Sequence, residues 1–297
     1  MNIQSLRHFV TVAEEGSLGR AREKLNITQT GLTKSIQRLE TSLGGALFRR
    51  SVQGMTLTQA GRTLLPHARL VLAQSDRAVS TVSDLIEGRD GAIAIGAAPE
   101  WLEFGVEQAV LDLRQKYPGT QIFISSGRNT RALVADLRDG RLDLVVGVSQ
   151  MEDMDDLIFE PIASNRQGII LAKGHELLEN DPVSLKDLEA YQWVLPVRST
   201  LFRARLDNLF LEQGLAPPVA EIETNFMPFV ISCVGHSGML GTATDALIAA
   251  HPRSDVTFLE MGSMLERPMG IMTRAGEPVT RPQRRFVDVL KAHVGKV

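Results

Sequence analysis

Two short amphipathic helices separated by a three-residue turn are the feature that most constrains this chain. Apolar residues recur at helical spacing over 18–25 and again over about 28–40, and each set defines one buried stripe. Asn26, Ile27 and Thr28 lie between the two, and Thr28 is a favourable N-cap for the second helix. The stripe residues are Leu18, Ala21, Leu25, Leu32, Ile36 and Leu39. Two helices joined in this way predict a helix-turn-helix.

The outward face of the second helix carries hydrogen-bonding side chains and no acid before Glu40. A recognition helix enters the major groove with its N-terminal residues foremost, where they meet base edges and phosphates. Gln29 is the candidate base reader, because a carboxamide pairs bidentately with adenine. Thr33 suits a base or a phosphate. The candidate DNA-binding residues of this helix are Thr28, Gln29, Thr30, Thr33, Lys34, Gln37 and Arg38. Taken alone, the pattern is equally typical of a solvated helix face.

Segments on both sides predict a winged form of this motif. Residues 3–14 place apolar side chains at helical spacing, which indicates a preceding helix. Residues 47–61 predict a β-hairpin with a turn near Gln53-Gly54, followed by Thr58 as the cap of another helix. Arg49 and Arg50 face outward on this hairpin, so both are candidates for phosphate contacts beside the groove.

The charge of the chain is unevenly distributed. Its formal net charge is −3, yet residues 1–58 contain eight Lys/Arg and four Asp/Glu. The first segment therefore carries +4 and the remainder −7. A basic head on an acidic body is expected when only the head meets phosphate.

Residues 1–87 resemble the winged helix-turn-helix and linker helix of LysR-type transcriptional regulators. The matching segments are FVTVAEEGS (9–17), TQTGLTKSIQRLE (28–40), LGGALFRR (43–50) and LTQAG (57–61). The family commonly has Ser-Gln-Pro-Ala or Ser-Gln-Ser-Ala where this chain has Thr28-Gln29-Thr30-Gly31. Thr28 keeps the cap, whereas Gly31 weakens the first helical turn by up to about 1 kcal/mol relative to Ala. This departure bears on which DNA sequence the chain prefers.

A long helix is predicted over 58–87. Its apolar positions repeat with alternating spacings of three and four, which is the seam of a coiled coil. A partner helix of a second chain is the favoured occupant, and packing against the chain's own body is the alternative. Pairing also suits two-fold proteins that read two half-sites, and the resemblance implies a dimer or a tetramer. The seam residues are Leu65, Ala68, Leu72, Ser75, Val79, Val82 and Ile86.

The body alternates strand-like apolar runs with amphipathic helices, which predicts an α/β fold with parallel strands. The resemblance implies a two-lobed, periplasmic-binding-protein-like effector domain with crossovers near 161–166 and 262–268. The fold class is thus α+β and multidomain. The expected divisions are 1–58 for the winged helix-turn-helix and 59–88 for the linker. The effector domain takes 89–297, with lobe 1 at about 89–162 and 267–297 and lobe 2 at about 163–266.

Ligands of open parallel sheets bind beyond the carboxyl ends of strands, near helix N-termini. The resemblance places effector contacts on the same loops. Hydroxyls, guanidinium groups and helix N–H groups there favour a small organic anion. Glu100 conflicts with a purely anion-selective site and suits an amine instead. The candidate effector-binding residues are Ala98, Pro99, Glu100, Arg128, Ser149, Arg198, Ser199, Thr200 and Phe226.

Other classes of protein are less well supported. The chain has no phosphate-binding G-x-x-x-x-G-K-[ST] motif, and the GHSGM segment at 235–239 fails the G-x-S-x-G pattern of hydrolases. Its six histidines are scattered, so neither a metal nor another cofactor is expected, and the chain is not expected to be an enzyme. We see no signal peptide or membrane-spanning run, which favours the cytoplasm. A single cysteine excludes an intramolecular disulfide.

The sequence therefore predicts a regulator that binds double-stranded promoter DNA as a homo-oligomer and responds to an effector. RNA polymerase is a further partner that such a protein would meet. Two alternatives stay open at this point. One is an architectural DNA-binding protein without an effector, and the other is a solute-binding protein with a helical extension.

Overall fold

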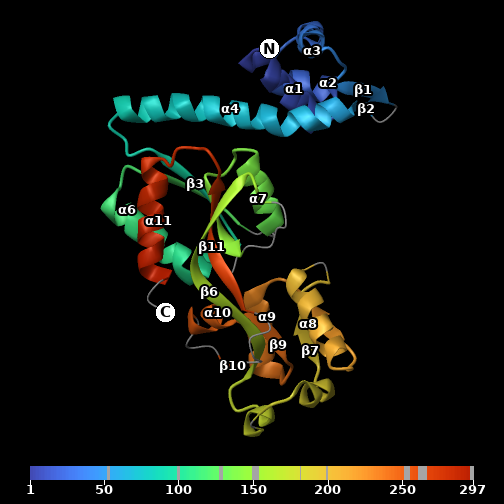
Figure 1. The fold of residues 1–297 in the computed structure, drawn as a ribbon, viewed down its shortest axis with the longest axis vertical. Helices are drawn as coiled ribbons and strands as arrows, with labels where there is room; N and C mark the ends of the chain where they lie inside the picture. Colours follow the sequence, from blue (N-terminus) through green and yellow to red (C-terminus); the bar gives the residue numbers. More distant parts are fainter. Residues whose placement is uncertain are drawn as a thin grey trace.

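A computed structural model of the chain describes residues 1–51, 54–98, 101–126, 130–148, 154–180, 182–198, 200–250, 255–259 and 266–294. Figure 1 shows three parts along the longest axis. The head, residues 1–57, lies at one end, and the long helix α4 crosses beneath it. Two α/β lobes follow below α4, with lobe 1 next to the helix and lobe 2 at the far end.

Capping residues mark where the helices of the head begin. The side chain of Asn2 accepts a hydrogen bond from the Ser5 amide at 2.8 Å, and that of Thr28 accepts from the Gly31 amide at 3.1 Å. Asn26 has φ 52°, so the chain turns within three residues. The helices are α1 (Ile3–Glu15), α2 (Leu18–Leu25) and α3 (Gln29–Leu43). The predicted helix-turn-helix is confirmed.

The wing is an antiparallel pair, β1 (Phe48–Ser51) and β2 (Gly54–Leu57), in which Phe48 lies opposite Leu57. Gln53, at the expected turn, lies outside the described residues. Thr58 joins the wing to α4 (Gln59–Ile86), because its hydroxyl donates to the Ala46 carbonyl at 2.7 Å and accepts from the Gly61 amide at 3.1 Å.

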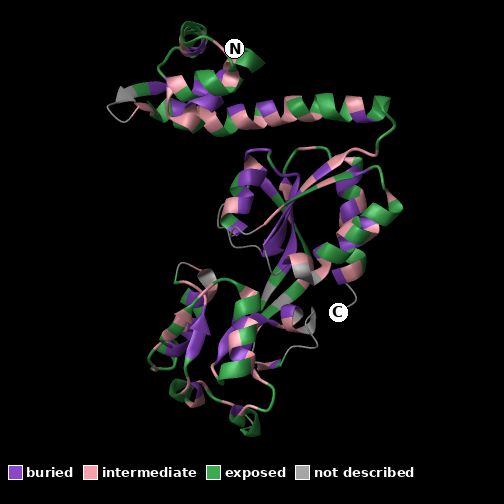
Figure 2. Ribbon diagram, turned by 180° about the vertical axis from the view of Figure 1, so that it is seen from behind, coloured by how far each residue is buried: buried purple, intermediate pink, exposed green. Residues whose placement is uncertain are grey.

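The predicted seam of α4 divides into two parts. Ala68 and Leu72 are buried in the hydrophobic core of the head, where α4 packs against α1. The expectation that Leu72 faces a partner helix is therefore wrong, because Leu72 is buried in the core of the head. Farther along, Val79, Val82, Leu85 and Ile86 are 67%, 56%, 80% and 79% exposed. The unburied part of the apolar stripe thus lies in this second half of α4, much of which Figure 2 shows as exposed.

Lobe 1 is built on a mixed sheet. Its parallel strands β4, β3 and β5 lie side by side, and β11 continues the sheet antiparallel to β5. The strands are β3 (Ala92–Ala97), β4 (Gln121–Ser125), β5 (Leu144–Val148) and β11 (Glu266–Arg274). The covering elements are the π-helical turn η1 (Leu102–Val106), α6 (Glu107–Lys116), α7 (Thr130–Arg138) and α11 (Arg281–Val294).

Lobe 2 packs helices against shorter strands. The strands are β7 (Trp193–Leu195), β8 (Ala220–Glu223), β9 (Gly241–Thr244) and β10 (Val256–Leu259). The helices are α8 (Leu201–Glu212), α9 (Met227–Ser237) and α10 (Asp245–Ala250), with 3-10 turns η2 (Glu176–Glu179) and η3 (Leu185–Ala190). β7 and β8 pair in parallel, so their carboxyl ends share one edge.

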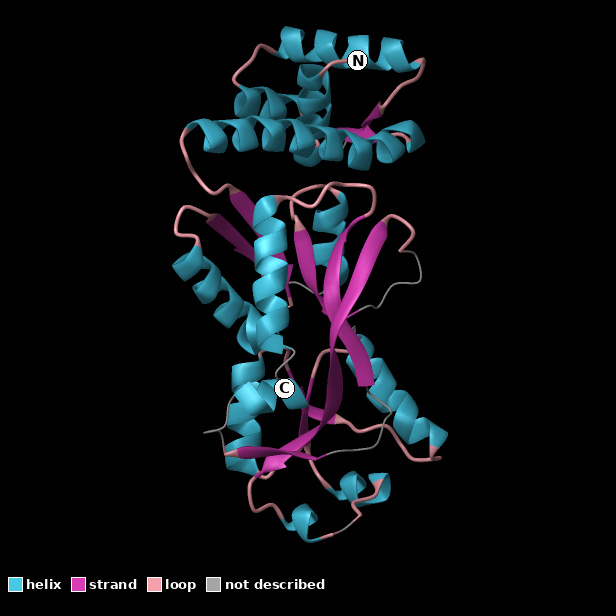
Figure 3. Cartoon of the chain, turned by 60° about the vertical axis from the view of Figure 1, so that its left-hand side comes forward, coloured by secondary structure: helices cyan, strands magenta, loops and turns pink. Residues whose placement is uncertain are grey.

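The two lobes are joined by strand rather than by loop. β6 (Leu157–Ala172) pairs with β11 over 157–166 and then with β9 and β10 over 167–172 (Figure 3). The crossover expected near 161–166 is thus the middle of one long strand. Of the second, expected near 262–268, the described part begins β11 at Glu266. Within the described ranges, no helix is long and apolar enough to cross a membrane.

Candidate nucleic-acid interface and effector loops

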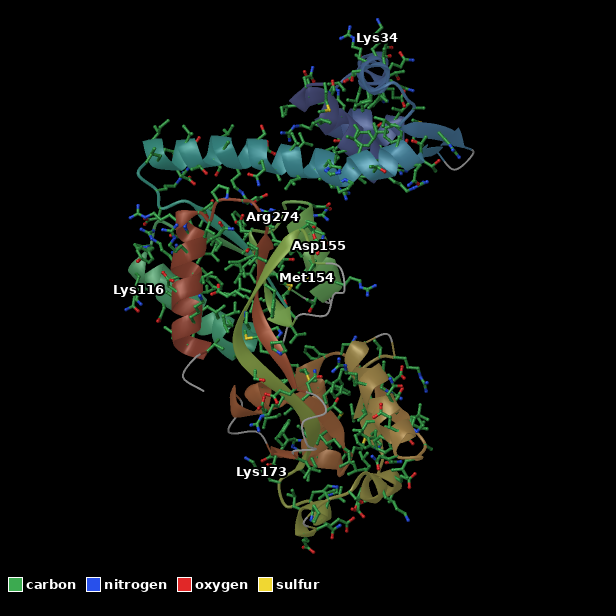
Figure 4. The ribbon with its side chains drawn as sticks, in the orientation of Figure 1. Lys34, Lys116, Met154, Asp155, Lys173 and Arg274 are labelled. Carbon is green, nitrogen blue, oxygen red and sulfur yellow. The ribbon has the colours of Figure 1, made fainter. Side chains whose placement is uncertain are left out.

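The outer face of α3 presents the polar side chains that the sequence singled out. Thr28, Gln29 and Thr30 are exposed at its start, and Thr33 is half-buried. Lys34 points away from α4 and from both lobes (Figure 4). Gln37 and Arg38 are also exposed one turn later, so the helix offers one continuous polar face.

Glu40, the acid near the far end of this helix, hydrogen-bonds to the start of the wing. Its Oε1 accepts hydrogen bonds from the Leu47 amide at 2.8 Å and the Phe48 amide at 3.3 Å. These bonds tie the start of β1 to α3, so the carboxylate faces the protein and leaves the α3 face without negative charge.

Glu40→Ala is expected to lower the free energy of unfolding of the head by about 1.5–3 kcal/mol, the range for hydrogen bonds to a charged group. Urea unfolding followed by circular dichroism would measure the loss. Glu23→Ala is the matched control, because Glu23 is exposed and, among the described residues, has Arg22 as its one ion-pair partner, at 3.6 Å. Equal losses in the two variants would contradict the role of Glu40.

A groove of about 580 Å³ runs along α3 on the side of α1. Lys34 and Arg38 line it from α3, and no acid is among its lining residues. The α1 side is formed by Met1, Asn2, Gln4, Ser5 and His8. Sequence reasoning missed this contribution of α1. The available signal was the polar edge of the first helix, where Asn2, Ser5 and His8 recur every three residues.

His8 lies in this groove as a neutral hydrogen-bonding group. The residue is 8% exposed, and its Nδ1 lies 2.7 Å from the Ser35 hydroxyl. Burial lowers the pKa of His8 from its ordinary value. The imidazole therefore holds α1 against α3 without adding charge near pH 7.

The cations of the head fall into two groups. Those behind α3 are paired within the protein: Arg7 Nη2 lies 2.7 Å from Asp76, and Lys24 Nζ lies 2.9 Å from Glu15. In the part of the chain that the structure describes, Lys34, Arg38 and Arg49 make no ion pair, and Arg49 is exposed on the wing. The side chain of Arg50 lies outside the described set. Unpaired cations thus gather on α3 and the wing.

Of the lobe 1 candidates, Ala98 lies among the described residues, at one edge of the sheet. β3, β4 and β5 are parallel, so Ala98 and Ser126 both follow strands that end there. The Ser126 hydroxyl is buried and has no hydrogen-bond partner among the described atoms. Pro99, Glu100, Arg128 and Ser149 lie outside the described residues.

The lobe 2 candidates follow β7 and β8. The Val197 amide donates to Asn225 Oδ1 at 3.2 Å, which brings the loops that contain Arg198 and Phe226 together. Arg198 is 72% exposed at its side chain and lies 3.8 Å from Glu223. Thr200 caps α8, with its hydroxyl donating to the Val197 carbonyl at 3.0 Å. Ser199 lies outside the described residues. Among the described residues, no hydrogen bond or ion pair joins these side chains to Ala98.

Among the residues that the structure describes, no group of three or more His, Cys, Asp or Glu side chains could hold a metal ion.

Comparison with known proteins matches both halves of the chain. Residues 3–62 match the model "Bacterial regulatory helix-turn-helix protein, lysR family", and residues 87–295 match "LysR substrate binding domain". The transcriptional regulator PcaQ of Agrobacterium fabrum is 25% identical over 301 residues, covering 100% of this chain and 96% of its own. The regulator GbpR of Azospirillum brasilense is 25% identical over 296 residues, covering 98% and 86%.

Solved structures share the whole architecture. CbnR, a LysR family transcriptional regulator, has a TM-score of 0.67 at 19% identity, with 99% of each chain covered. Full-length CbnR in complex with its target DNA also has a TM-score of 0.67 at 19% identity, covering 99% of this chain and 100% of that one.

Proposed function

This chain belongs to the LysR family of transcriptional regulators, and from that premise we propose which residues carry out its tasks. A regulator of this family binds DNA through its helix-turn-helix and a small-molecule effector through its C-terminal domain, and it is not an enzyme. Neither the effector-free architectural protein nor the solute-binding protein is favoured. We propose the divisions 1–58, 59–88 and 89–297 for the winged helix-turn-helix, linker and effector domain.

We propose that α3 enters the major groove of promoter DNA and that the wing contacts a flanking strand. The observation that carries this proposal is the set of unpaired cations on α3 and the wing, on a surface from which Glu40 is withdrawn. The groove beside α1 is proposed to seat the other flanking strand, because its lining contains cations and no acid. The proposed contacts are Thr28, Gln29, Thr30, Thr33, Lys34, Gln37, Arg38, Arg49 and Arg50.

Gln29→Ala is expected to lose about 1–3 kcal/mol of discrimination between specific and random duplex, if Gln29 pairs with a base. The measurement is competition binding, with a duplex selected from a random library by the wild-type protein. Lys34→Ala is the control for a phosphate contact. It should weaken both duplexes alike and lower the salt slope by about one unit. An equal loss on both duplexes for Gln29→Ala would leave it as a phosphate contact only.

We propose that the exposed end of α4 pairs with the same helix of a second copy, giving a dimer. The apolar stripe from Val79 to Ile86 supports this, because monomeric proteins rarely expose such a patch. A tetramer of two dimers is the further step. We also propose a cytoplasmic location, where promoter DNA is reached, and RNA polymerase as a partner at the promoter.

We propose that the effector is a small organic anion bound at the strand ends of both lobes. The proposed contacts are Ala98, Pro99, Glu100, Arg128, Ser149, Arg198, Ser199, Thr200 and Phe226. Arg198 supports the choice of an anion, since it is exposed and its pair with Glu223 at 3.8 Å is loose. The Ser126 hydroxyl, which has no hydrogen-bond partner among the described atoms, adds a hydrogen-bonding group at the lobe 1 edge.

Arg198→Gln is expected to abolish the thermal stabilisation that an organic carboxylate gives the full chain. A ligand at 100 times its Kd stabilises by about 2.7 kcal/mol, which a thermal-shift screen against a carboxylate panel detects. Arg205→Gln, an exposed arginine on α8, is the matched control. Hits only among amines or neutral compounds would overturn the anion and favour Glu100 as a contact.

A further inference from the structure

Helix α4 is fastened to lobe 1 by a compact set of polar contacts. Gln74 Nε2 donates to Glu277 Oε1 at 2.8 Å, and Arg77 pairs with Asp143 while its Nη1 lies 3.9 Å from Glu277. Figure 4 shows Arg274, which supports this site, directly beneath α4. We call the whole set the α4–lobe 1 joint. It comprises Arg69, Ala73, Gln74 and Arg77 of α4 with Asp139, Gly140, Asp143 and Glu277 of lobe 1.

The lobe 1 partners of α4 are part of the sheet framework. Asp143 is buried, and its Oδ2 accepts from the Ala94 amide of β3 at 2.7 Å. Gln283 of α11 donates to the Asp143 carbonyl at 3.0 Å. Glu277 accepts from Arg274 Nε at 2.7 Å. A movement of these strands therefore reaches α4 through the Arg77–Asp143 ion pair and the Gln74–Glu277 hydrogen bond.

One arginine links the joint to the head. Arg69 Nη1 lies 3.0 Å from Asp139 of lobe 1, and its Nη2 lies 3.0 Å from Glu14 of α1. The head, α4 and lobe 1 thus meet at a single guanidinium group. Gly140 sets how closely they approach: it has φ 76°, and an added Cβ there would lie 2.6 Å from the Ala73 Cβ.

Two strands run from this joint to the proposed effector loops. β3 is held near its amino end at Ala94 and leads to Ala98, and β5 begins directly after Asp143 and leads to Val148. Each strand spans on the order of 17 Å at its usual rise per residue. Binding at one end of these strands and docking of α4 at the other end therefore act on the same rigid elements.

We propose that the α4–lobe 1 joint couples occupancy of the effector loops to the position of the DNA-binding head. Arg69 and Arg77 are each 23% exposed at their side chains, so both guanidinium groups stay partly solvated when their ion pairs open, whereas Asp139 and Asp143 are 10% and 9% exposed and are costly to leave unpaired. A coupling element has to be breakable, because a contact present equally in both states transmits nothing. This inference rests on the effector loops proposed above.

Coupling between two sites is reciprocal, so DNA can serve as the probe in place of an unidentified effector. Hydrogen–deuterium exchange would be measured on the full-length protein, with and without a duplex selected from a random library. In the wild type, duplex binding should change exchange in peptides that cover 92–98 and 142–148 by at least about fivefold, the lower end of typical coupling. Arg77→Gln removes the ion pairs with Asp143 and Glu277, and Gly140→Ala places a methyl group between lobe 1 and α4. Both variants should still bind the duplex but should lose the change in exchange.

Each variant has a matched control. Arg89→Gln removes an arginine just beyond α4 whose ion pairs in the described part of the chain are local, with Asp84 and Glu87. Gly214→Ala introduces a side chain at a similar positive φ of 70° in lobe 2, where nothing lies within 4 Å. Both controls should keep the wild-type response. Wild-type protein that binds the duplex with unchanged exchange in these peptides would overturn the coupling and leave DNA binding intact. An unaltered response in Arg77→Gln and Gly140→Ala would overturn it equally.

Discussion

Val79→Asp combined with Val82→Asp is expected to convert the full chain to a monomer and to weaken its binding of a two-half-site duplex at least about 100-fold, the lower end of the gain from bivalency. Both side chains are more than half exposed on the second half of α4. Two aspartates there would face their copies across the proposed pairing, where unpaired charges oppose burial. Loss of pairing separates the two heads, so each half-site is bound singly.

Light scattering and duplex titration of the same sample would measure both effects. Ser80→Asp is the control, because it adds a charge to α4 at an exposed position outside the apolar stripe. It should keep the wild-type mass. A double variant that retains the full oligomer would show that another surface holds the copies together.

Leu72→Ala should have a large effect of a different kind, lowering the free energy of unfolding of the head by about 2–4 kcal/mol. Leu72 is 8% exposed in the core that α4 forms with α1, and truncation leaves a cavity between the helices. The oligomeric mass should stay unchanged in native buffer.

Urea unfolding in the Val79→Asp/Val82→Asp background would separate this loss from assembly. Val71→Ala is the matched control, since Val71 lies next to Leu72 on α4 and is 41% exposed. Surface truncations usually stay within about 0.5 kcal/mol. If Leu72→Ala instead changed the mass and not the stability, the division of the α4 stripe would be wrong.

The head was largely predictable because its signals are local. Helical spacing, Thr28 as a cap and the short turn before it fix α2 and α3 within a few residues of their observed ends. The same reasoning failed on α4 because periodicity shows which side is apolar, not what covers it. Half of that stripe is covered by α1, which no spacing within α4 could indicate.

Contacts between distant parts of the chain could not be predicted from the sequence, for a related reason. Gln74 and Glu277 are 203 positions apart, and both are polar residues that any surface helix or loop would carry. The role of Glu40 was missed because its partners are backbone amides, which have no sequence signature. The first half of β6 has no clear strand pattern in the sequence, since the segment before Arg166 mixes polar residues and a proline with apolar ones.

The way the lobes are connected limits how they can move. β6 and β11 cross from lobe 1 toward lobe 2 as neighbours in one antiparallel ladder, with a register shift between Met269 and Gly270. Two lobes on separate loops could swing apart freely, but here wide opening would break ladder hydrogen bonds. The remaining degrees of freedom are bending and twisting of a two-stranded ribbon, which is most compliant at the register shift. Effector binding is therefore expected to bend or twist this ribbon rather than to separate the lobes.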